Sequence, residues 1–290
     1  MSKKSDAKLS TGKGALTVKR IIVYIVLILL VFVSLFPFYL LIINSTRGRA
    51  QSGIELIPQG EFWGNLKNLF SQKTTTFYGN VFRTLGNSLF IAVCTSALTV
   101  YFSALTAYAI HAYNFKLKKA AHTFILLIMM VPTQASAIGF YRFMDDLSLT
   151  NTYIPLIVPA VAAPATYFFM IQYMKSSLPL EIVEASRIDG CGEFKTFNRI
   201  ILPIMKPAFA VQAIFAFVTS WNNFFMPQMI LSDKSKFTVP LILAVMRGET
   251  EKDLGVINMY IVVAVIPVII IYLCLSKFII RGVALGSVKG

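Results

Sequence analysis

Six stretches of about 20 mostly apolar residues run along this chain, and none carries Asp, Glu, Lys or Arg in its interior, since Arg142 lies next to the end of the third. A helix of about 20 residues crosses the roughly 30 Å hydrocarbon core of a bilayer. An irregular chain cannot satisfy its backbone polar groups there, so each stretch is expected to be a transmembrane helix. We therefore predict an all-α integral membrane protein with six transmembrane helices, at residues 21–43, 86–110, 121–143, 153–174, 207–228 and 256–276.

The distribution of basic residues predicts the orientation of these helices. Of the 27 Lys and Arg residues, 17 lie in the segments on one side of the membrane, together with 5 acidic residues. That side carries a net charge of about +12, against about +2 on the other, and the positive-inside rule assigns it to the cytoplasm. Both termini are then cytoplasmic, and the formal net charge of +14 reflects membrane topology and not a nucleic-acid partner.

The remaining segments follow from this topology. Residues 1–20 form a polar cytoplasmic segment that we expect to be disordered. Residues 44–85 form a long extracytoplasmic loop, 86–276 the transmembrane core, and 277–290 a cytoplasmic tail. The three cysteines match no metal-binding or disulfide spacing, so we expect free thiols and no metal site.

The cytoplasmic loop at residues 175–206 is the most informative segment outside the membrane. Pro179 suits the first turn of a helix, and Glu181 and Glu184 favour its positive N-terminal end. Gly190 can end the helix in a left-handed conformation. The sequence therefore predicts a helix of about ten residues that stops at Gly190.

A second short helix is predicted after Gly190, and Pro203 is expected to end it before the fifth span. Phe194 and Phe197 are three residues apart and are expected to share one face of that helix. Ala185 and Ser186 are small, which would allow a partner surface to approach closely. Physical reasoning alone leaves two interpretations open, a loop that lies on the membrane surface and a loop that docks onto another protein.

The spacing within this loop resembles the EAA loop of binding-protein-dependent ABC importer permeases. Glu184-Ala185-Ser186, then Gly190, then Ile200-x-Leu202-Pro203 matches that pattern at every gap, with Ser186 in place of the second Ala. The resemblance covers about residues 80–290 and implies a MetI-like type-1 ABC permease core, with the first span as an additional helix. Residues 282–290 and 221–223 resemble permeases for maltose-type sugars, which implies import of a sugar and favours an oligosaccharide.

The resemblance also implies how the chain works. In this family the loop docks into a cleft on a cytoplasmic ATPase subunit, so residues 180–189 would form the coupling helix. Glu184 would pair with a basic group on the ATPase, and Gly190 would permit the bend. The residues thereby assigned to ATPase coupling are Glu181, Glu184, Ala185, Ser186, Asp189, Gly190, Ile200, Leu202 and Pro203.

The implied partners are a second and different permease subunit, two ATPase subunits and an extracytoplasmic solute-binding protein, assembled in the cell membrane. The chain has no Gly-x-x-x-x-Gly-Lys-Ser/Thr sequence. We therefore expect it not to be an enzyme and to bind no cofactor, with ATP and magnesium held by the ATPase. Family likeness further suggests that residues 229–255 reach the binding protein and that residues 282–290 touch the ATPases. A solvated loop and a frayed terminus are the respective alternatives.

Uncharged polar residues within the spans are candidates for the solute pathway. Amide groups suit sugar hydroxyls and aromatic rings can stack on sugars, so the candidates are Gln134, Trp221, Asn222 and Asn223. Hydrogen bonds between helices and simple packing are the alternatives. A permease for a non-sugar solute and a secondary transporter also remain open, although a secondary transporter usually has ionisable residues inside the membrane. A membrane-embedded enzyme finds no supporting motif.

Overall fold

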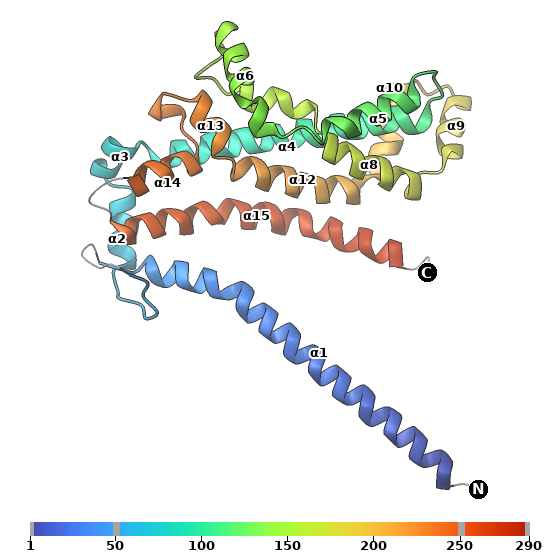
Figure 1. Ribbon diagram of the computed structural model, residues 1–290, viewed down its shortest axis with the longest axis horizontal. Coiled ribbons are helices and arrows are strands. Elements are labelled where there is room, and N and C mark those ends of the chain that lie inside the picture. Colours follow the sequence, from blue (N-terminus) through green and yellow to red (C-terminus); the bar gives the residue numbers. More distant parts are fainter. Residues whose placement is uncertain (1–2, 49–52, 249–252, 288–290) are drawn as a thin grey trace. The chain divides into compact units, whose positions relative to one another are not determined.

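The structure of the protein is a computed structural model that describes residues 3–48, 53–248 and 253–287, with the backbone alone for 3–19, 133 and 278–287. Every regular element in this part of the chain is a helix (Figure 1). The chain divides into two compact units, Met1–Leu69 with Glu251–Val262, and Phe70–Thr250 with Val263–Gly290.

The first unit contains helices α1 (Lys3–Asn44) and α2 (Phe62–Leu69) and the beginning of α15 (Leu254–Ser287). The predicted first span, 21–43, lies inside α1. The expectation of disorder before it is wrong, because α1 already begins at Lys3. This segment contains five Lys residues, which are good helix formers and favour continuation of the helix.

The loop that follows α1 in this unit is held in place by buried polar groups. The side-chain amide of Asn65 donates to the carbonyl oxygens of Ser45, at 2.9 Å, and of Arg47, at 2.7 Å. Gly255 lies so close that a Cβ there would collide with the Arg47 carbonyl and with the Asn65 side chain. Only glycine fits at position 255, so Arg47, Asn65 and Gly255 together hold the loop against the start of α15.

The second unit is built around α4 (Val81–Ala112). Its neighbours are α8 (Pro164–Ser177) and α12 (Lys206–Trp221), both of which pack along it. The other helices are α3 (Gln72–Tyr78), α5 (Lys118–Ile128), α6 (Thr133–Asp146), α7 (Ile154–Ile157), the 3-10 helix η1 (Val158–Val161), α13 (Phe225–Ile230), η3 (Lys234–Lys236) and α14 (Val239–Gly248).

Residues 179–203, here called the elbow, join α8 to α12. They contain α9 (Leu180–Ile188), α10 (Glu193–Thr196), the π-helical turn η2 (Phe197–Ile201) and most of α11 (Leu202–Ile204).

Four helical segments among the described residues are long and apolar enough to cross a membrane: Arg20–Asn44, Val81–Ala112, Ile154–Ser177 and Leu254–Lys277. A fifth is obtained if Glu193–Ile204 and Lys206–Trp221, which are bent by 83°, count as one broken span. The prediction of six spans is therefore not confirmed.

The third predicted span, 121–143, is not a continuous helix. Helix α5 ends at Ile128 and α6 begins at Thr133, with turns between them. Pro132 adopts φ −64° and ψ 120°. A proline has no backbone N–H to donate, and it disfavours helical geometry at the residue before it. Pro132 therefore explains the break that hydropathy alone did not indicate.

The fifth predicted span, 207–228, also differs, because α12 ends at Trp221 and a separate helix α13 follows. Beyond it, residues 229–255, for which a solvated loop was one of two interpretations, contain α14, whose apolar face is buried at Val239, Leu241, Ile242 and Met246. Residues 249–252 of that loop lie outside the described part of the chain.

A row of hydroxyl groups on α4 fastens the proline-rich segment that precedes α8. Thr99 Oγ1 donates to the carbonyl of Ala160 at 3.1 Å, and Ser103 Oγ donates to the carbonyl of Ala163 at 3.3 Å. Pro164 has no N–H to offer the Ala160 carbonyl four residues earlier. Thr99 supplies the missing donor from a neighbouring helix, which is how a broken helix is stabilised where no water is present.

Candidate functional site: the elbow

Helix α9 begins and ends as the sequence predicted. Pro179 precedes its first residue in an extended conformation, and Glu181 lies in the first turn. At the other end Gly190 has φ +73°, where a side chain would be strained. The N–H of Gly190 donates to Arg187 O at 3.0 Å and the N–H of Cys191 to Ser186 O at 2.9 Å. These two bonds form a Schellman motif that ends the helix firmly.

The second helical segment of the elbow is present, but Pro203 does not end it. Pro203 lies in α11, and the chain turns at Met205 before α12 begins at Lys206. Phe194 and Phe197 do not share a face, because Phe194 is 72% exposed and Phe197 only 1%. The backbone passes into the π-helical turn at Phe197, which changes the helical phase from that residue onward.

Ser186 does not face outward to a partner. It is buried, its hydroxyl donates to Val183 O at 2.7 Å, and its Oγ lies 3.1 Å from Thr196 Oγ1. The small residue at this position therefore allows α9 and α10 to approach each other within the chain. Ala185, by contrast, is exposed.

A carboxylate links the two elbow helices to α4. Arg187 Nε donates to Glu193 Oε1 at 2.8 Å, and the hydroxyl of Tyr108 donates to Glu193 Oε2 at 2.9 Å. The Arg187 guanidinium also lies over the ring of Tyr113, 5.2 Å from its centroid. The hydrogen bond from Arg187 is the main reason that the pKa of Glu193 is below its ordinary value. Glu193 was not among the residues assigned to coupling from the sequence. The only sequence signal for it is its position, six residues after Arg187 and just past the glycine that ends α9.

The elbow is also anchored in the apolar core of the second unit. Val183, Phe197 and Ile201 are buried in the cluster that includes Tyr108 and Met205. The ring of Phe197 lies 5.6 Å from that of Tyr108. The inner face of the elbow is therefore fixed against α4 and α8.

The acidic residues assigned to coupling are exposed on α9 and at the residue that follows it. Glu181, Glu184 and Asp189 are exposed, and Glu184 forms no ion pair or side-chain hydrogen bond within the described residues. Glu184 lines a polar cavity of about 360 Å³ together with Tyr113, Asn114 and Arg187. Leu180 and Ile188 leave apolar side chains exposed on the same helix, Ile188 by 87%. Of the remaining residues assigned to coupling, Ile200 and Leu202 are half-buried and Pro203 is exposed.

The candidate pathway residues lie away from the elbow and do not form one cluster. Trp221 is buried at the end of α12 and stacks on Phe217, with ring centroids 5.6 Å apart. Asn222 is exposed, and Asn223 Oδ1 accepts from Met226 N at 3.3 Å at the start of α13. Gln134 is exposed on a different helix, in the first turn of α6. Trp221, Asn222 and Asn223 are consecutive and lie at the turn between α12 and α13, whereas Gln134 lies apart from them on α6.

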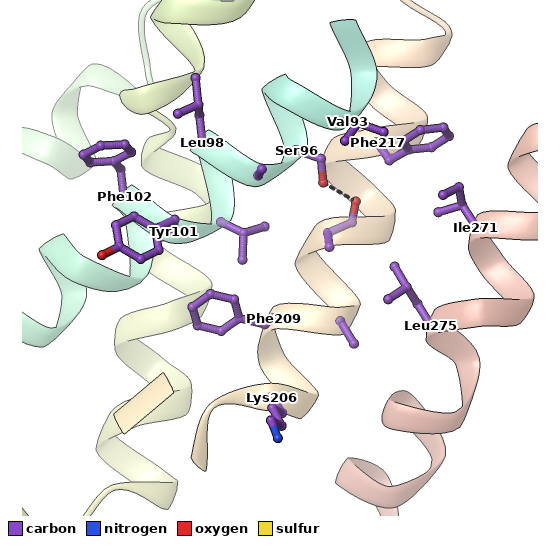
Figure 2. Close-up of a pocket in the computed structure, with 14 residues that line it drawn as sticks. Val93, Ser96, Leu98, Tyr101, Phe102, Lys206, Phe209, Phe217, Ile271 and Leu275 are labelled. Atoms are coloured by element: carbon purple, nitrogen blue, oxygen red, sulfur yellow. Dashed lines mark hydrogen bonds between the residues drawn. The ribbon is translucent and has the colours of Figure 1, made fainter. Parts of the chain in front are cut away.

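A cavity of about 790 Å³ in the second unit lies among α4, α12 and α15 and is almost wholly apolar (Figure 2). Its few polar groups are mostly engaged, since Ser96 Oγ donates to Ala213 O at 2.8 Å and Tyr101 Oη to Asn198 Oδ1 at 3.2 Å. None of the candidate pathway residues lines it. A sugar needs several well-placed hydrogen-bonding groups, so this cavity does not suit one.

One polar residue that the sequence analysis missed organises the opposite end of the second unit. Asn151 adopts φ +56°, which asparagine tolerates better than most residues. Its Oδ1 accepts from the N–H groups of Ser232 and Asp233, and its carbonyl accepts from Lys236 Nζ at 2.7 Å. Within the described residues, no group of three His, Cys, Asp or Glu side chains is arranged to hold a metal ion.

Comparison with known proteins identifies relatives along nearly the whole chain. It is 33% identical to the arabinooligosaccharides transport system permease protein AraQ of Halalkalibacterium halodurans, over 89% of this chain and 92% of the relative. It is 31% identical to the trehalose/maltose transport system permease protein MalG of Thermococcus litoralis, over 94% and 98%. It is 29% identical to the lactose transport system permease protein LacG of Rhizobium radiobacter, over 93% and 96%.

The fold is shared with a chain in the crystal structure of a bacterial ABC transporter involved in the import of the acidic polysaccharide alginate. That match has a TM-score of 0.75 at 21% identity and covers 90% of this chain and 96% of the other. A chain of the MetNI methionine ABC transporter matches with a TM-score of 0.55 at 15% identity, over 73% of this chain and 98% of that one. Both matches support the MetI-like permease fold.

The family model described as "binding-protein-dependent transport system inner membrane component" matches residues 99–284, a range that contains the elbow and most of the second unit. This protein therefore belongs to that family of ABC transporter permeases and is a membrane component of a transport system.

Proposed function

We propose that this chain is the permease subunit of an ABC importer for a disaccharide or short oligosaccharide, and that it forms half of the translocation pathway. The observation that carries the proposal is the elbow. Its helix α9 begins after Pro179 and ends in the Schellman motif at Gly190, and it buries Val183 in the core while its acidic side chains stay exposed. The relatives named above transport arabinooligosaccharides, trehalose and maltose, and lactose, which favours a small glycoside as the solute.

In the proposed topology the chain crosses the membrane six times, with both termini in the cytoplasm. The third crossing consists of α5 and α6 together, since 11 and 14 residues of helix are each too short for a bilayer. The fifth consists of α12 continued by α13, which, with the turn between them, contain the predicted residues 207–228. The concentration of Lys and Arg on the side of the elbow supports this orientation.

The proposed work of the elbow is mechanical. Two cytoplasmic ATPase subunits bind and hydrolyse ATP with magnesium, and α9 docks onto one of them through Glu184 and its exposed neighbours. Because α9 is short and its C-terminus is fixed by the Schellman motif, a movement of the ATPase displaces it as a rigid body. A second permease subunit completes the pathway, and an extracytoplasmic binding protein delivers the sugar. The tail at residues 282–290 is a further proposed contact, but its side chains lie outside the described residues.

The test is ATP-driven uptake in vesicles that contain both permeases, the ATPases and the binding protein, with radiolabelled lactose, maltose and an arabinooligosaccharide as solutes. Glu184→Lys is expected to abolish uptake and to lower co-purification of the ATPase, since it reverses the charge at the proposed contact. Asp146→Lys is the matched control, because Asp146 is exposed on α6 and far from the elbow in sequence. Undiminished uptake and complex formation with Glu184→Lys would remove Glu184 from the mechanism. Uptake driven by an ion gradient without any ATPase would instead favour a secondary transporter.

A further inference from the structure

Glu193 occupies a junction between three elements. It is the first residue of α10, just beyond the bend at Gly190 that ends α9. One of its carboxylate oxygens accepts a hydrogen bond from Arg187 on α9, and the other accepts one from Tyr108 on α4. A single side chain therefore joins both elbow helices to the membrane helix at the centre of the bundle.

The partners of this carboxylate are themselves held in place. Tyr108 is buried and its ring packs against Phe197, so its hydroxyl group has a fixed position. The Arg187 guanidinium lies over the ring of Tyr113, the residue that follows α4. Both hydrogen bonds to Glu193 thus lead back to the same end of α4.

This arrangement suits the transmission of force better than it suits stabilisation. The side chains of Arg187 and Glu193 are 37% and 41% exposed, and ion pairs with that much solvent contact contribute little to stability. The elbow already gains its attachment from the buried side chains of Val183, Phe197 and Ile201. Apolar contacts are not directional, whereas two hydrogen bonds to the two oxygens of one carboxylate set the orientation of α9 relative to α4.

We infer that Glu193 is a positioning residue that makes α9 and α4 move as one body when the ATPases close. The inference rests on the proposed function, because it takes the ATPase to be the source of the motion. It adds that the motion enters the bundle through the end of α4, by way of Glu193 and Tyr108. The exposed acidic residues of α9 then contact the ATPase, and Glu193 transmits the resulting movement of α9 to α4.

The test compares Tyr108→Phe and Glu193→Gln in the complete transporter. Tyr108→Phe removes one hydrogen bond and keeps the buried ring, so the variant retains its packing. Tyr173→Phe is the matched control, since Tyr173 lies on the neighbouring α8 and its hydroxyl has no hydrogen-bond partner within the described residues. Spin labels on the native Cys191, which directly follows α9 and is not among the residues assigned to docking, and on Phe82→Cys, an exposed position on α4, report the distance between the two helices before and after addition of ATP and magnesium, with Cys94 and Cys274 replaced by Ser.

In the otherwise unsubstituted protein and in Tyr173→Phe we expect the α9-to-α4 distance to remain single and unchanged when ATP is added. In Tyr108→Phe and Glu193→Gln the distance should change or broaden, while ATPase subunits co-purify at the normal ratio. Sugar imported per ATP hydrolysed should fall by about tenfold, the size expected for loss of one hydrogen bond to a charged group.

Unchanged distances and unchanged sugar-to-ATP ratios in both variants would overturn the inference and leave the proposed function intact. A failure of the unsubstituted protein to bind any ATPase would instead overturn the proposed function. If Glu193→Gln assembles poorly, Tyr108→Phe alone decides the question, because it leaves the Arg187–Glu193 pair in place.

Discussion

Helix α12 begins and ends in turns that are stabilised in different ways. At Lys206 it follows an 83° bend, and the elbow on the other side of that bend is held by residues of α4 and α8. At Trp221 it ends in a turn stabilised by its own backbone and by the side chain of Asn223. The first turn is fixed by contacts from several elements, and the second mainly by local ones. A turn of the first kind can transmit a movement between distant parts, whereas a turn of the second kind can rearrange without disturbing the bundle.

Removal of the buried aromatic side chain in the elbow should have the largest effect. Phe197→Ala is expected to lower the free energy of unfolding by about 3–5 kcal/mol, because it empties a buried site between Tyr101 and Tyr108. Phe194→Ala, three residues earlier and 72% exposed, should change it by less than about 0.5 kcal/mol. Thermal unfolding in detergent measures both. Equal effects of the two substitutions would contradict the description of the elbow as anchored on one face.

The glycine pair of the elbow gives a test of backbone conformation alone. Gly190 has φ +73° and Gly192 has φ −67°, and neither has an atom within 4 Å of an added Cβ. Gly190→Ala should therefore destabilise the elbow by about 1–2 kcal/mol, whereas Gly192→Ala should cost less than about 1 kcal/mol, from the weaker preference for Ala at the N-cap of α10. Amide hydrogen exchange of residues 185–191 is the direct measurement. Equal protection in the two variants would show that the end of α9 does not depend on the left-handed residue.

The other end of α12 can be tested through its two asparagines. Asn223→Ala removes a helix-capping hydrogen bond and should cost about 1 kcal/mol of stability. Asn222→Ala, at an exposed position, should cost much less. If the role of this turn is structural, the apparent KM for sugar uptake will stay the same in both variants. A large rise in KM with Asn222→Ala would instead place this residue in the solute pathway, as the sequence analysis proposed.

The smallest expected effect is the pH dependence of the Arg187–Glu193 pair. The pKa of Glu193 is lower in the folded protein than its ordinary value, with the Arg187 hydrogen bond as the main cause. Its contribution to stability is therefore present above the unfolded pKa of about 4.3 and is lost as the pH falls through the folded value. Unfolding temperatures of the unsubstituted protein and of Glu193→Gln should differ slightly at pH 7 and converge at pH values below the folded pKa. A difference that persists there would mean that the carboxylate charge does not matter.

The parts of the elbow that could be predicted are those set by local backbone rules. Gly190 and Glu181 act within one or two turns of their own positions, so their spacing was sufficient to predict where α9 begins and ends. The roles of Ser186 and Glu193 depend on what lies opposite them, which is α10 in one case and α4 in the other. No local rule in a single sequence supplies that information, and the small side chain of Ser186 was accordingly assigned to the wrong surface.

The same distinction explains the fold. Long apolar runs predicted the helices that contain residues 21–43, 86–110 and 256–276 because burial in lipid requires only length and composition. Hydropathy averaged over about 20 residues does not locate the break at Pro132 or the end of α12 at Trp221, although a polar residue follows each, Gln134 in one case and Asn222 in the other. The boundaries of the loops and of the terminal segments stay predictions.

The hydrogen bonds from Thr99 and Ser103 to the carbonyls of Ala160 and Ala163 have a consequence for biogenesis. During synthesis α4 leaves the ribosome before the proline-rich segment, so its donors already reside in the bilayer when the unsatisfied carbonyls arrive. A circularly permuted chain that begins at residue 113 would reverse that order and expose those carbonyls to lipid until the last helices were made.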